Sequence, residues 1–225
     1  MNKDTFWALI REAKERFGQD MDTSLCWLMD ELIKRGPNAA QGFHDIIHAY
    51  SDLANQYGLW DAASIIKEYG CGDDGFLDFR SWLIAQGKEV YLAALKDPDS
   101  LADVEPYGDC RFECLAYVGS DAYQLMTDRS AYDDMDRDAY QVLRDELGKE
   151  ITYKDGIPYP REPRDLPAFL PKLCAKYGGP ERFNVQASIW NHDLHVIRKM
   201  LDAGKLHDQK KASKKKKPNQ RGDTR

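Results

Sequence analysis

A glycine-rich loop that carries two adjacent carboxylates has the clearest potential for chemistry. Asp73 and Asp74 lie in segment 70–75, where three glycines in six residues give the backbone unusual freedom. Adjacent carboxylates on such a loop can hold a hard cation or bind a cationic side chain. The structural alternative is that Asp73 or Asp74 caps a helix starting at 75–76, while Asp78 complements the dipole of that helix. An EF-hand is excluded, because its further oxygen ligands and late Glu are absent.

The helix expected after this loop places an arginine among aromatic and acidic side chains. Arg80 is expected to pair with Asp73, Asp74, Asp78 or an acid elsewhere, and it can also receive a carboxylate or a phosphate. Trp82 and its aromatic neighbours follow helical spacing, which favours a core role and leaves a ligand pocket as the alternative. These five residues form the candidate ligand or partner site.

Two histidines four residues apart form the first candidate metal site. His44 and His48 fall on one face of an expected helix, a spacing that lets two imidazoles bind one metal ion. The HEXXH pattern of metalloproteases needs Glu after the first histidine, but that residue is Asp45. A third ligand is not evident, although Asp45 or Asp52 can serve. The alternative is a pair of partly exposed histidines on a helix face.

Two other pairs contain metal-binding residue types. His192 and His195 are three residues apart, and again only two ligands are visible. Cys110 and Cys114 share a face if their segment is helical, but they lack zinc-knuckle spacing and companions. Since no export signal is seen, the five cysteines are expected to be free thiols.

Motifs for nucleophilic, phosphate or dinucleotide chemistry are missing from the sequence. It contains no G-x-S-x-G, no Walker motif and no dinucleotide-binding glycine pattern. No catalytic residue and no cofactor are therefore predicted, and the sequence favours a protein that is not an enzyme.

Charge is divided unequally along the chain. Residues 205–225 hold nine Lys and Arg against two Asp, a charge of +7, so the total of −6 leaves −13 for residues 1–204. The acidic body suits a basic protein partner and repels nucleic acid. The tail, through Lys214, Lys215, Lys216 and Lys217 above all, can touch nucleic acid weakly or fold back on the body.

The apolar spacing predicts an all-α fold, an irregular multi-helix bundle with almost no strand. The expected helices span 4–17, 23–35, 39–57, 59–69, 76–87, 90–95, 111–126, 139–147, 166–177 and 186–201.

Composition suggests three parts of the chain. Residues 1–147 are expected to form a helical domain. Five prolines in 150–171 predict an extended connector across that domain, and residues 148–204 join it to C-terminal helices. Residues 205–225 are expected to be a disordered basic tail. No apolar run is long enough for a membrane span and no signal peptide is seen, so a cytoplasmic protein without membrane contact is expected.

Residues 1–130 resemble the bacterial domain-of-unknown-function family 4240 through four motifs in the correct order. The motifs are D-x-F-W-x-L-I at 4–10, L-W-x-A-A at 59–63, G-C-x-D-D-G-F-x-D-F-R-x-W-L-I-x-Q-G at 70–87 and A-L-x-D-P-D-S-L-A-D at 94–103. The resemblance implies a helical domain and carries no established activity, substrate or catalytic residue.

The function expected from these observations is an accessory protein that binds another protein through its acidic helical surface. Bacterial immunity and stress-response proteins have this character. The alternatives are an enzyme or small-ligand protein that uses Asp73, Asp74 and Arg80, and nucleic-acid association through the tail.

Overall fold

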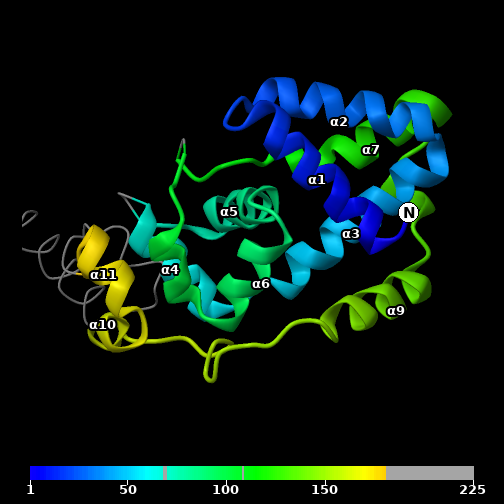
Figure 1. Ribbon diagram of the computed structural model, residues 1–225. Helices are drawn as coiled ribbons and strands as arrows, with labels where there is room; N and C mark the ends of the chain where they lie inside the picture. Colours follow the sequence, from blue (N-terminus) through cyan, green and yellow to red (C-terminus); the bar gives the residue numbers. More distant parts are fainter. Residues whose placement is uncertain (68–69, 108, 181–225) are drawn as a thin grey trace, which may run out of the picture.

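A computed structural model describes residues 1–67, 70–107 and 109–180 (Figure 1). In these ranges the chain forms helices and no strand, which confirms the predicted all-α class. None of the helices in this part of the chain is long and apolar enough to cross a membrane.

The first half of the described chain contains six α-helices. They are α1 (Lys3–Phe17), α2 (Met21–Arg35), α3 (Pro37–Leu53), α4 (Tyr57–Ile66), α5 (Asp73–Ala85) and α6 (Lys88–Lys96). The second half contains the 3-10 helix η1 (Pro98–Asp103), α7 (Cys114–Thr127), α8 (Ala131–Asp134), α9 (Arg137–Gly148), the 3-10 helix η2 (Pro163–Asp165), α10 (Leu166–Phe169) and α11 (Pro171–Tyr177).

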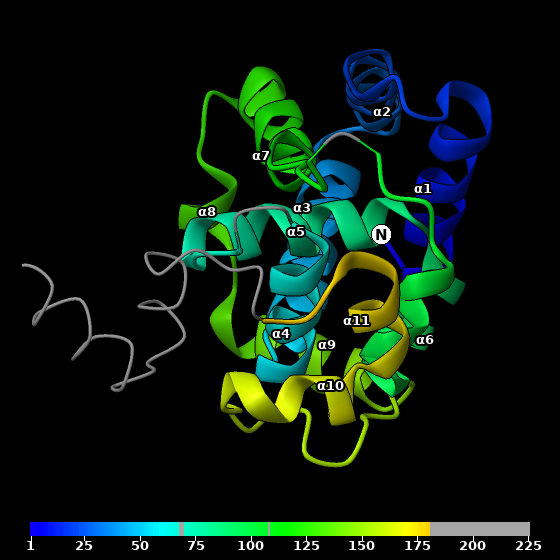
Figure 2. The same ribbon diagram turned by 90° about the vertical axis from the view of Figure 1, so that its left-hand side faces the viewer.

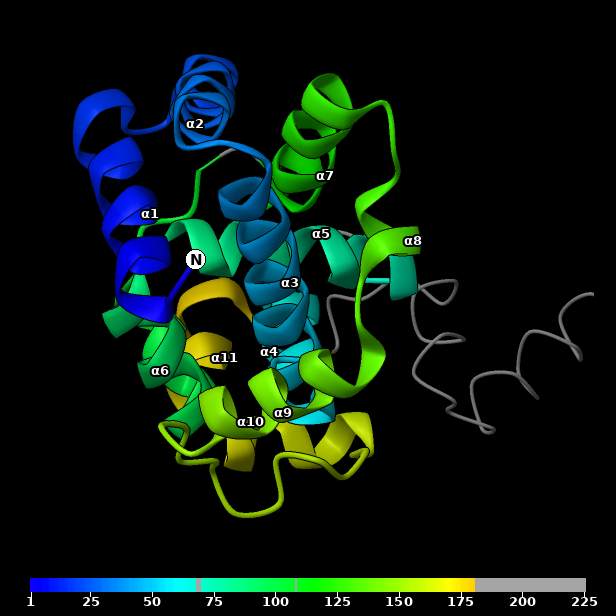
Figure 3. The same ribbon diagram turned by 90° about the vertical axis from the view of Figure 1, so that its right-hand side faces the viewer.

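Helix α3 is the centre of the bundle and contacts α1, α2, α5, α7 and α9 (Figure 3). Its apolar residues surround much of the helix, and Phe43, Ile46, Ile47 and Tyr50 are at most 1% exposed. Pro37 occupies the first turn, where its missing N–H leaves no helical hydrogen bond unmade. A helix apolar on several faces must be covered on several sides, which is why the other helices gather around α3.

The core beside α3 is aromatic, and hydrogen bonds join Trp7, Tyr50 and Tyr91 within it. Trp7 Nε1 donates to Tyr50 Oη at 2.9 Å, and Tyr91 Oη donates to the Tyr50 carbonyl at 2.6 Å. The Phe6 and Phe43 rings lie 5.0 Å apart beside them. Buried phenol and indole groups are stable when each finds a partner, as these do.

Several helix boundaries differ from the predicted ones. The helix expected at 39–57 ends at Leu53, because the chain turns at 54–56 before α4 begins. The helix expected at 59–69 likewise ends early, at Ile66. The helix expected at 23–35 begins earlier, at Met21, and its N-cap is Asp20, which accepts from Thr23 N at 3.1 Å. The helix expected at 166–177 is divided, since Leu170 leaves helical geometry before Pro171 starts α11.

The proline-rich segment lies across the body, as predicted (Figure 1). Tyr153 Oη donates to the Leu53 carbonyl at 3.0 Å, and Gly58 N donates to the Ile157 carbonyl at 2.7 Å. The segment thus completes hydrogen bonds at the end of α3 and the start of α4. α10 and α11 then pack beside α4 and η1 (Figure 2).

A partly buried contact between a carboxyl and a guanidinium group joins this segment to α4. Arg161 and Asp61 are 13% and 14% exposed, with Nη1 and Oδ2 3.4 Å apart. Burial raises the pKa of Asp61 to about 7, although Arg161 opposes the shift. Between pH 3.8 and 7 the folded state retains a proton that the unfolded state releases, so this group's contribution to stability falls as pH rises.

We predict that Asp61→Asn removes this pH dependence. The free energy of unfolding of the variant, minus that of the wild type, should increase from pH 5 to pH 7 by about 1 kcal/mol per pH unit or less. Urea titrations at several pH values measure it. Asp165→Asn, at an exposed aspartate of η2, is the control and should give a constant difference. A difference for Asp61→Asn that falls with pH would contradict the prediction.

Two predictions lie outside the described residues. They are the helix at 186–201, with His192 and His195, and the basic tail at 205–225. The division into residues 1–147 and 148–204 stays a prediction.

Candidate functional site

The glycine loop leads directly into α5, which begins at Asp73 rather than at 75–76. The N-cap is Gly72, and no side chain makes a capping hydrogen bond, so the prediction that Asp73 or Asp74 caps the helix is wrong. Both carboxylates are exposed in the first turn, where they complement the helix dipole.

Arg80 turns toward α3 and not toward these acids. Its Nη1 donates to the Ser51 carbonyl at 2.8 Å, and its guanidinium lies 5.1 Å from the centre of the Phe76 ring. Burial lowers the pKa of Arg80, while Asp52 and Tyr91 oppose the shift. In the described ranges no ion pair joins Arg80 to an acid of α5, so the expected Asp–Arg site does not assemble.

Asp78 lies on another side of α5, beside the loop that precedes α7. Burial is the largest cause of its raised pKa, followed by Glu113, and Lys67 opposes the shift. The side chain of Lys67 is 4% exposed, and its Nζ donates to the Asp109 carbonyl at 3.0 Å. No pattern in the sequence singles out Lys67, because only the fold brings residues 67 and 109 together.

Trp82 is a core residue. It is 1% exposed, and its ring lies 5.3 Å from Phe79 and 5.9 Å from Tyr107. The core interpretation of this helical spacing is thus confirmed, and Trp82 does not line an open ligand pocket.

The cysteines are free thiols in the described residues. Cys110 precedes α7 with a φ of 49°, so it does not share a helix face with the exposed Cys114. Burial raises the pKa of Cys71 to about 12 and that of Cys110 to about 11, which keeps both thiols protonated at neutral pH.

His44 and His48 do lie together, and a tyrosine from α8 joins them. Their ring centres are 4.4 Å apart, and the Tyr132 ring lies 4.3 Å from His44. Tyr132 Oη is 2.9 Å from His48 Nε2. Across the described ranges, no group of three His, Cys, Asp or Glu residues is placed to hold a metal ion.

A close crossing of α7 over α3 forms one wall of this cluster. A Cβ atom added at Gly119 would lie 2.7 Å from the His44 backbone nitrogen and 3.0 Å from the Ala40 carbonyl oxygen. Both atoms belong to the backbone of α3, which cannot move aside as the end of a flexible side chain can.

We predict that Gly119→Ala destabilises the fold by about 1–3 kcal/mol, because α7 must move away from α3. Gly75→Ala is the matched control, since its Cβ would meet only ordinary contacts at 3.6 Å or more and alanine favours a helix. Urea unfolding of both variants tests the pair. Equal free energies of unfolding for the two variants would contradict the close approach of α7 to α3.

The outer surface of α7, α8 and α9 combines exposed apolar side chains with acids; we call it the acidic face. Half of the eight large hydrophobic side chains exposed in the described chain lie here: Tyr117, Leu125, Tyr132 and Val142. Leu125 and Val142 are 69% and 62% exposed. Residues 113–150 hold ten Asp and Glu against four Lys and Arg, a charge of −6. The three helices follow one another along α3 (Figure 3).

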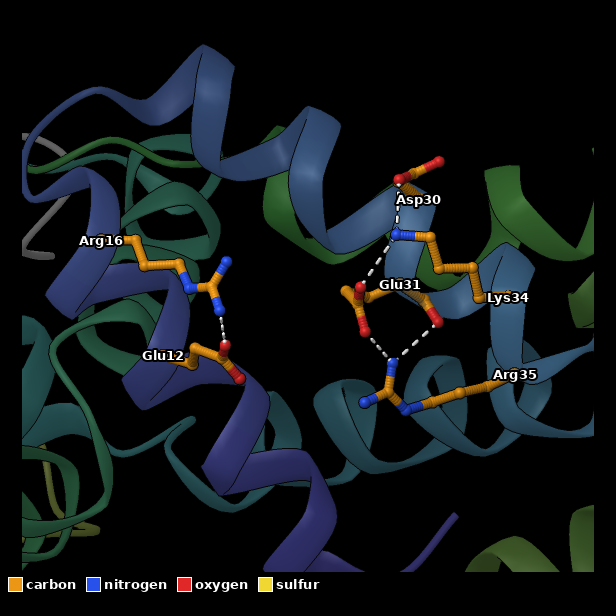
Figure 4. A network of polar contacts seen from close by, with 6 residues as sticks. All are labelled: Glu12, Arg16, Asp30, Glu31, Lys34 and Arg35. Carbon is orange, nitrogen blue, oxygen red and sulfur yellow. Dashed lines mark hydrogen bonds and ion pairs between the residues drawn. The ribbon is translucent and has the colours of Figure 1, made fainter.

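The surface of α1 and α2 is different, because its charges neutralise one another. Residues 1–36 hold seven acids against six bases. Figure 4 shows Lys34 Nζ between Asp30 and Glu31, at 2.9 and 3.1 Å, with Arg35 on Glu31. A separate pair joins Glu12 to Arg16 on α1 (Figure 4).

The fold and its surfaces define an all-α protein with an acid-rich helical face. A family model described as "Protein of unknown function (DUF4240)" matches residues 1–125, more than half of the 225-residue chain. The chain therefore belongs to this family, as the four motifs indicated. No curated protein and no solved structure gives a significant match.

Proposed function

We propose that this protein is a binding module that engages a basic, amphipathic segment of a protein partner through its acidic face. The observation that carries the proposal is the coincidence on α7, α8 and α9 of four exposed large apolar side chains with a local charge of −6. Apolar side chains that cluster on a surface mark interaction sites more strongly than scattered ones.

The two kinds of side chain have different roles in such binding. Tyr117, Leu125, Tyr132 and Val142 can be covered by the apolar side of a partner helix, which provides affinity. The surrounding carboxylates attract Lys and Arg on the flanks of that helix, increase the association rate and reject acidic competitors. Because the electrostatic part is screened, binding should weaken as salt is added.

The centre of the face is held in place before any partner arrives. Tyr132 is fixed by its contacts with His48 and His44, and the Gln41 amide donates to the Ala131 carbonyl at 3.0 Å. Tyr117 Oη donates to Glu113 at 3.1 Å. Tyrosines held this way lose little conformational entropy on binding.

The experiment measures binding of a synthetic amphipathic helical peptide made of Leu and Lys, by fluorescence anisotropy on the full chain. Asp121→Lys/Asp145→Lys reverses two exposed charges on α7 and α9. We expect this variant to weaken binding by at least tenfold at about 50 mM salt, with the difference reduced at about 200 mM. Leu125→Ser/Val142→Ser removes apolar contacts, and its loss should persist at the higher salt.

Glu15→Lys/Asp22→Lys is the matched control, since it makes the same charge change on exposed residues of α1 and α2. It should change affinity by less than about threefold at the lower salt. Equal weakening by both charge-reversal variants would show general attraction to an acidic protein and would reject the acidic face as the site. Absence of binding by the wild type would reject the function.

A further inference from the structure

Three polar atoms in the cluster under α8 have no protein partner. Both ring nitrogens of His44 and the side-chain oxygen of Gln41 are buried without a hydrogen bond to the described residues. His44 itself is 0% exposed. A buried polar atom without a partner destabilises the folded state, so such atoms in one place call for a physical explanation.

The two imidazoles lie close enough together to be ligands of one ion. They project from successive turns of α3, and their ring centres are 4.4 Å apart. Burial is the main cause of the lowered pKa of both histidines, and it brings His44 to about 4. Burial thus disfavours the charged form of both rings, and the uncharged imidazole is the form that binds metals.

Tyr132 adds a third donor from a different helix. Its Oη is 2.9 Å from His48 Nε2. Two donor atoms that are each about 2.1 Å from one zinc ion lie roughly 3.0–3.4 Å apart, depending on the angle between them. The observed separation is just below this range, so the two atoms are close enough to bind one ion, which would displace the phenol proton to solvent. Tyr132 is 47% exposed, which leaves an approach from solvent.

The charges around the cluster are negative. Asp52 interacts electrostatically with His48, and Asp121 does so with Tyr132. Asp45 accepts a hydrogen bond from the Gln41 amide at 2.8 Å. Their field attracts a cation, while none of them is placed to complete a set of three His, Cys, Asp or Glu ligands in the described ranges. A site with two nitrogens and a phenol oxygen favours zinc or copper over the hard ions magnesium and calcium.

We propose that His44, His48 and Tyr132 form a binding site for a divalent transition ion of the zinc type, with solvent completing the coordination. The site lies between α3 and α8, directly beneath the acidic face. It is a separate property from binding of a basic partner, and either can exist without the other.

The test is titration of the full chain with Zn²⁺ by calorimetry, together with the absorbance of the Co²⁺ form. The wild type should bind one Zn²⁺ and should not bind Mg²⁺ at the same concentrations. His48→Gln should weaken Zn²⁺ binding by at least tenfold, and Tyr132→Phe by about tenfold. Both side chains are partly exposed, so these variants keep the fold even if a His44 variant does not, and circular dichroism verifies this.

Two control variants test other candidate ligands of the chain. Cys26→Ser/Cys114→Ser removes the exposed thiols, and His192→Gln/His195→Gln removes the second histidine pair. Both should retain the wild-type affinity, and the Co²⁺ spectrum should lack the intense near-ultraviolet band of thiolate ligation. The proposal is overturned if His48→Gln/Tyr132→Phe binds like the wild type, if a control abolishes binding, or if the wild type binds no Zn²⁺.

Discussion

Trp82→Ala is expected to lower the free energy of unfolding by about 3–5 kcal/mol, the range typical of removing a buried tryptophan. The side chain is 1% exposed and packs between Phe79 of α5 and Tyr107 of the segment before α7. Its removal leaves a cavity at a point where helices meet, and close-packed neighbours relax into such a space only in part. Urea unfolding followed by far-ultraviolet circular dichroism measures the loss.

Two substitutions separate packing from other effects of losing Trp82. Trp82→Phe retains much of the ring volume and removes an indole N–H that has no partner in the described chain, so it should cost less than about 2 kcal/mol. Leu77→Ala, on the same helix but 38% exposed, should cost less than about 1 kcal/mol. A Trp82→Ala loss as small as that of Leu77→Ala would show that Trp82 does not belong to the core.

The helices could be predicted from sequence because their apolar spacing records which side must be buried. Phe6, Leu9, Ile10 and Ala13 follow this spacing, and all lie in the core. Helix ends were less predictable, since they depend on neighbours that the periodicity does not contain. The four-residue helix α8 was missed because it is held mainly by a Ser130 cap and by contacts with α3.

The candidate sites show a sharper limit of sequence reasoning. The acids and the arginine of α5 are close in sequence, yet Arg80 is bound to a carbonyl 29 residues away. Conversely, Tyr132 is 84 residues from His48 and still contacts it. Leu125 fits the apolar pattern of α7 but is 69% exposed, because a pattern does not show which apolar side chains remain uncovered. Long-range proximity and exposure are properties of the packed chain.

The D-P-D-S-L-A-D part of the fourth family motif has a role that only the packed chain shows. It forms η1, and its three aspartates bind the segment that lies beyond the family match. Asp97 pairs with Lys154 at 2.7 Å, and Asp103 pairs with Lys172 at 3.4 Å. Asp99 is the buried member of the three, at 3% exposed. This short acidic element is thus one of the contacts, together with α4, that hold the C-terminal helices on the family domain.

Asp99→Ala is expected to destabilise the protein by about 2–4 kcal/mol and to loosen α11. The two carboxylate oxygens of Asp99 accept from Lys172 N at 3.0 Å and Leu173 N at 2.9 Å. These are the first N–H groups of α11 that need a partner, because Pro171 has none to donate. Each bond involves a charged acceptor, and its loss leaves a donor unsatisfied near the core.

Asp103→Ala is the control for this prediction, because it removes an exposed carboxylate from the same 3-10 helix and breaks only an ion pair with Lys172. It should cost less than about 1 kcal/mol. Hydrogen exchange distinguishes the two variants further: amides of α11 should lose protection in Asp99→Ala while those of α3 retain most of theirs, since α3 is central to the bundle and α11 is held at its edge. Equal protection of α11 in the two variants would show that Asp99 does not fasten this helix.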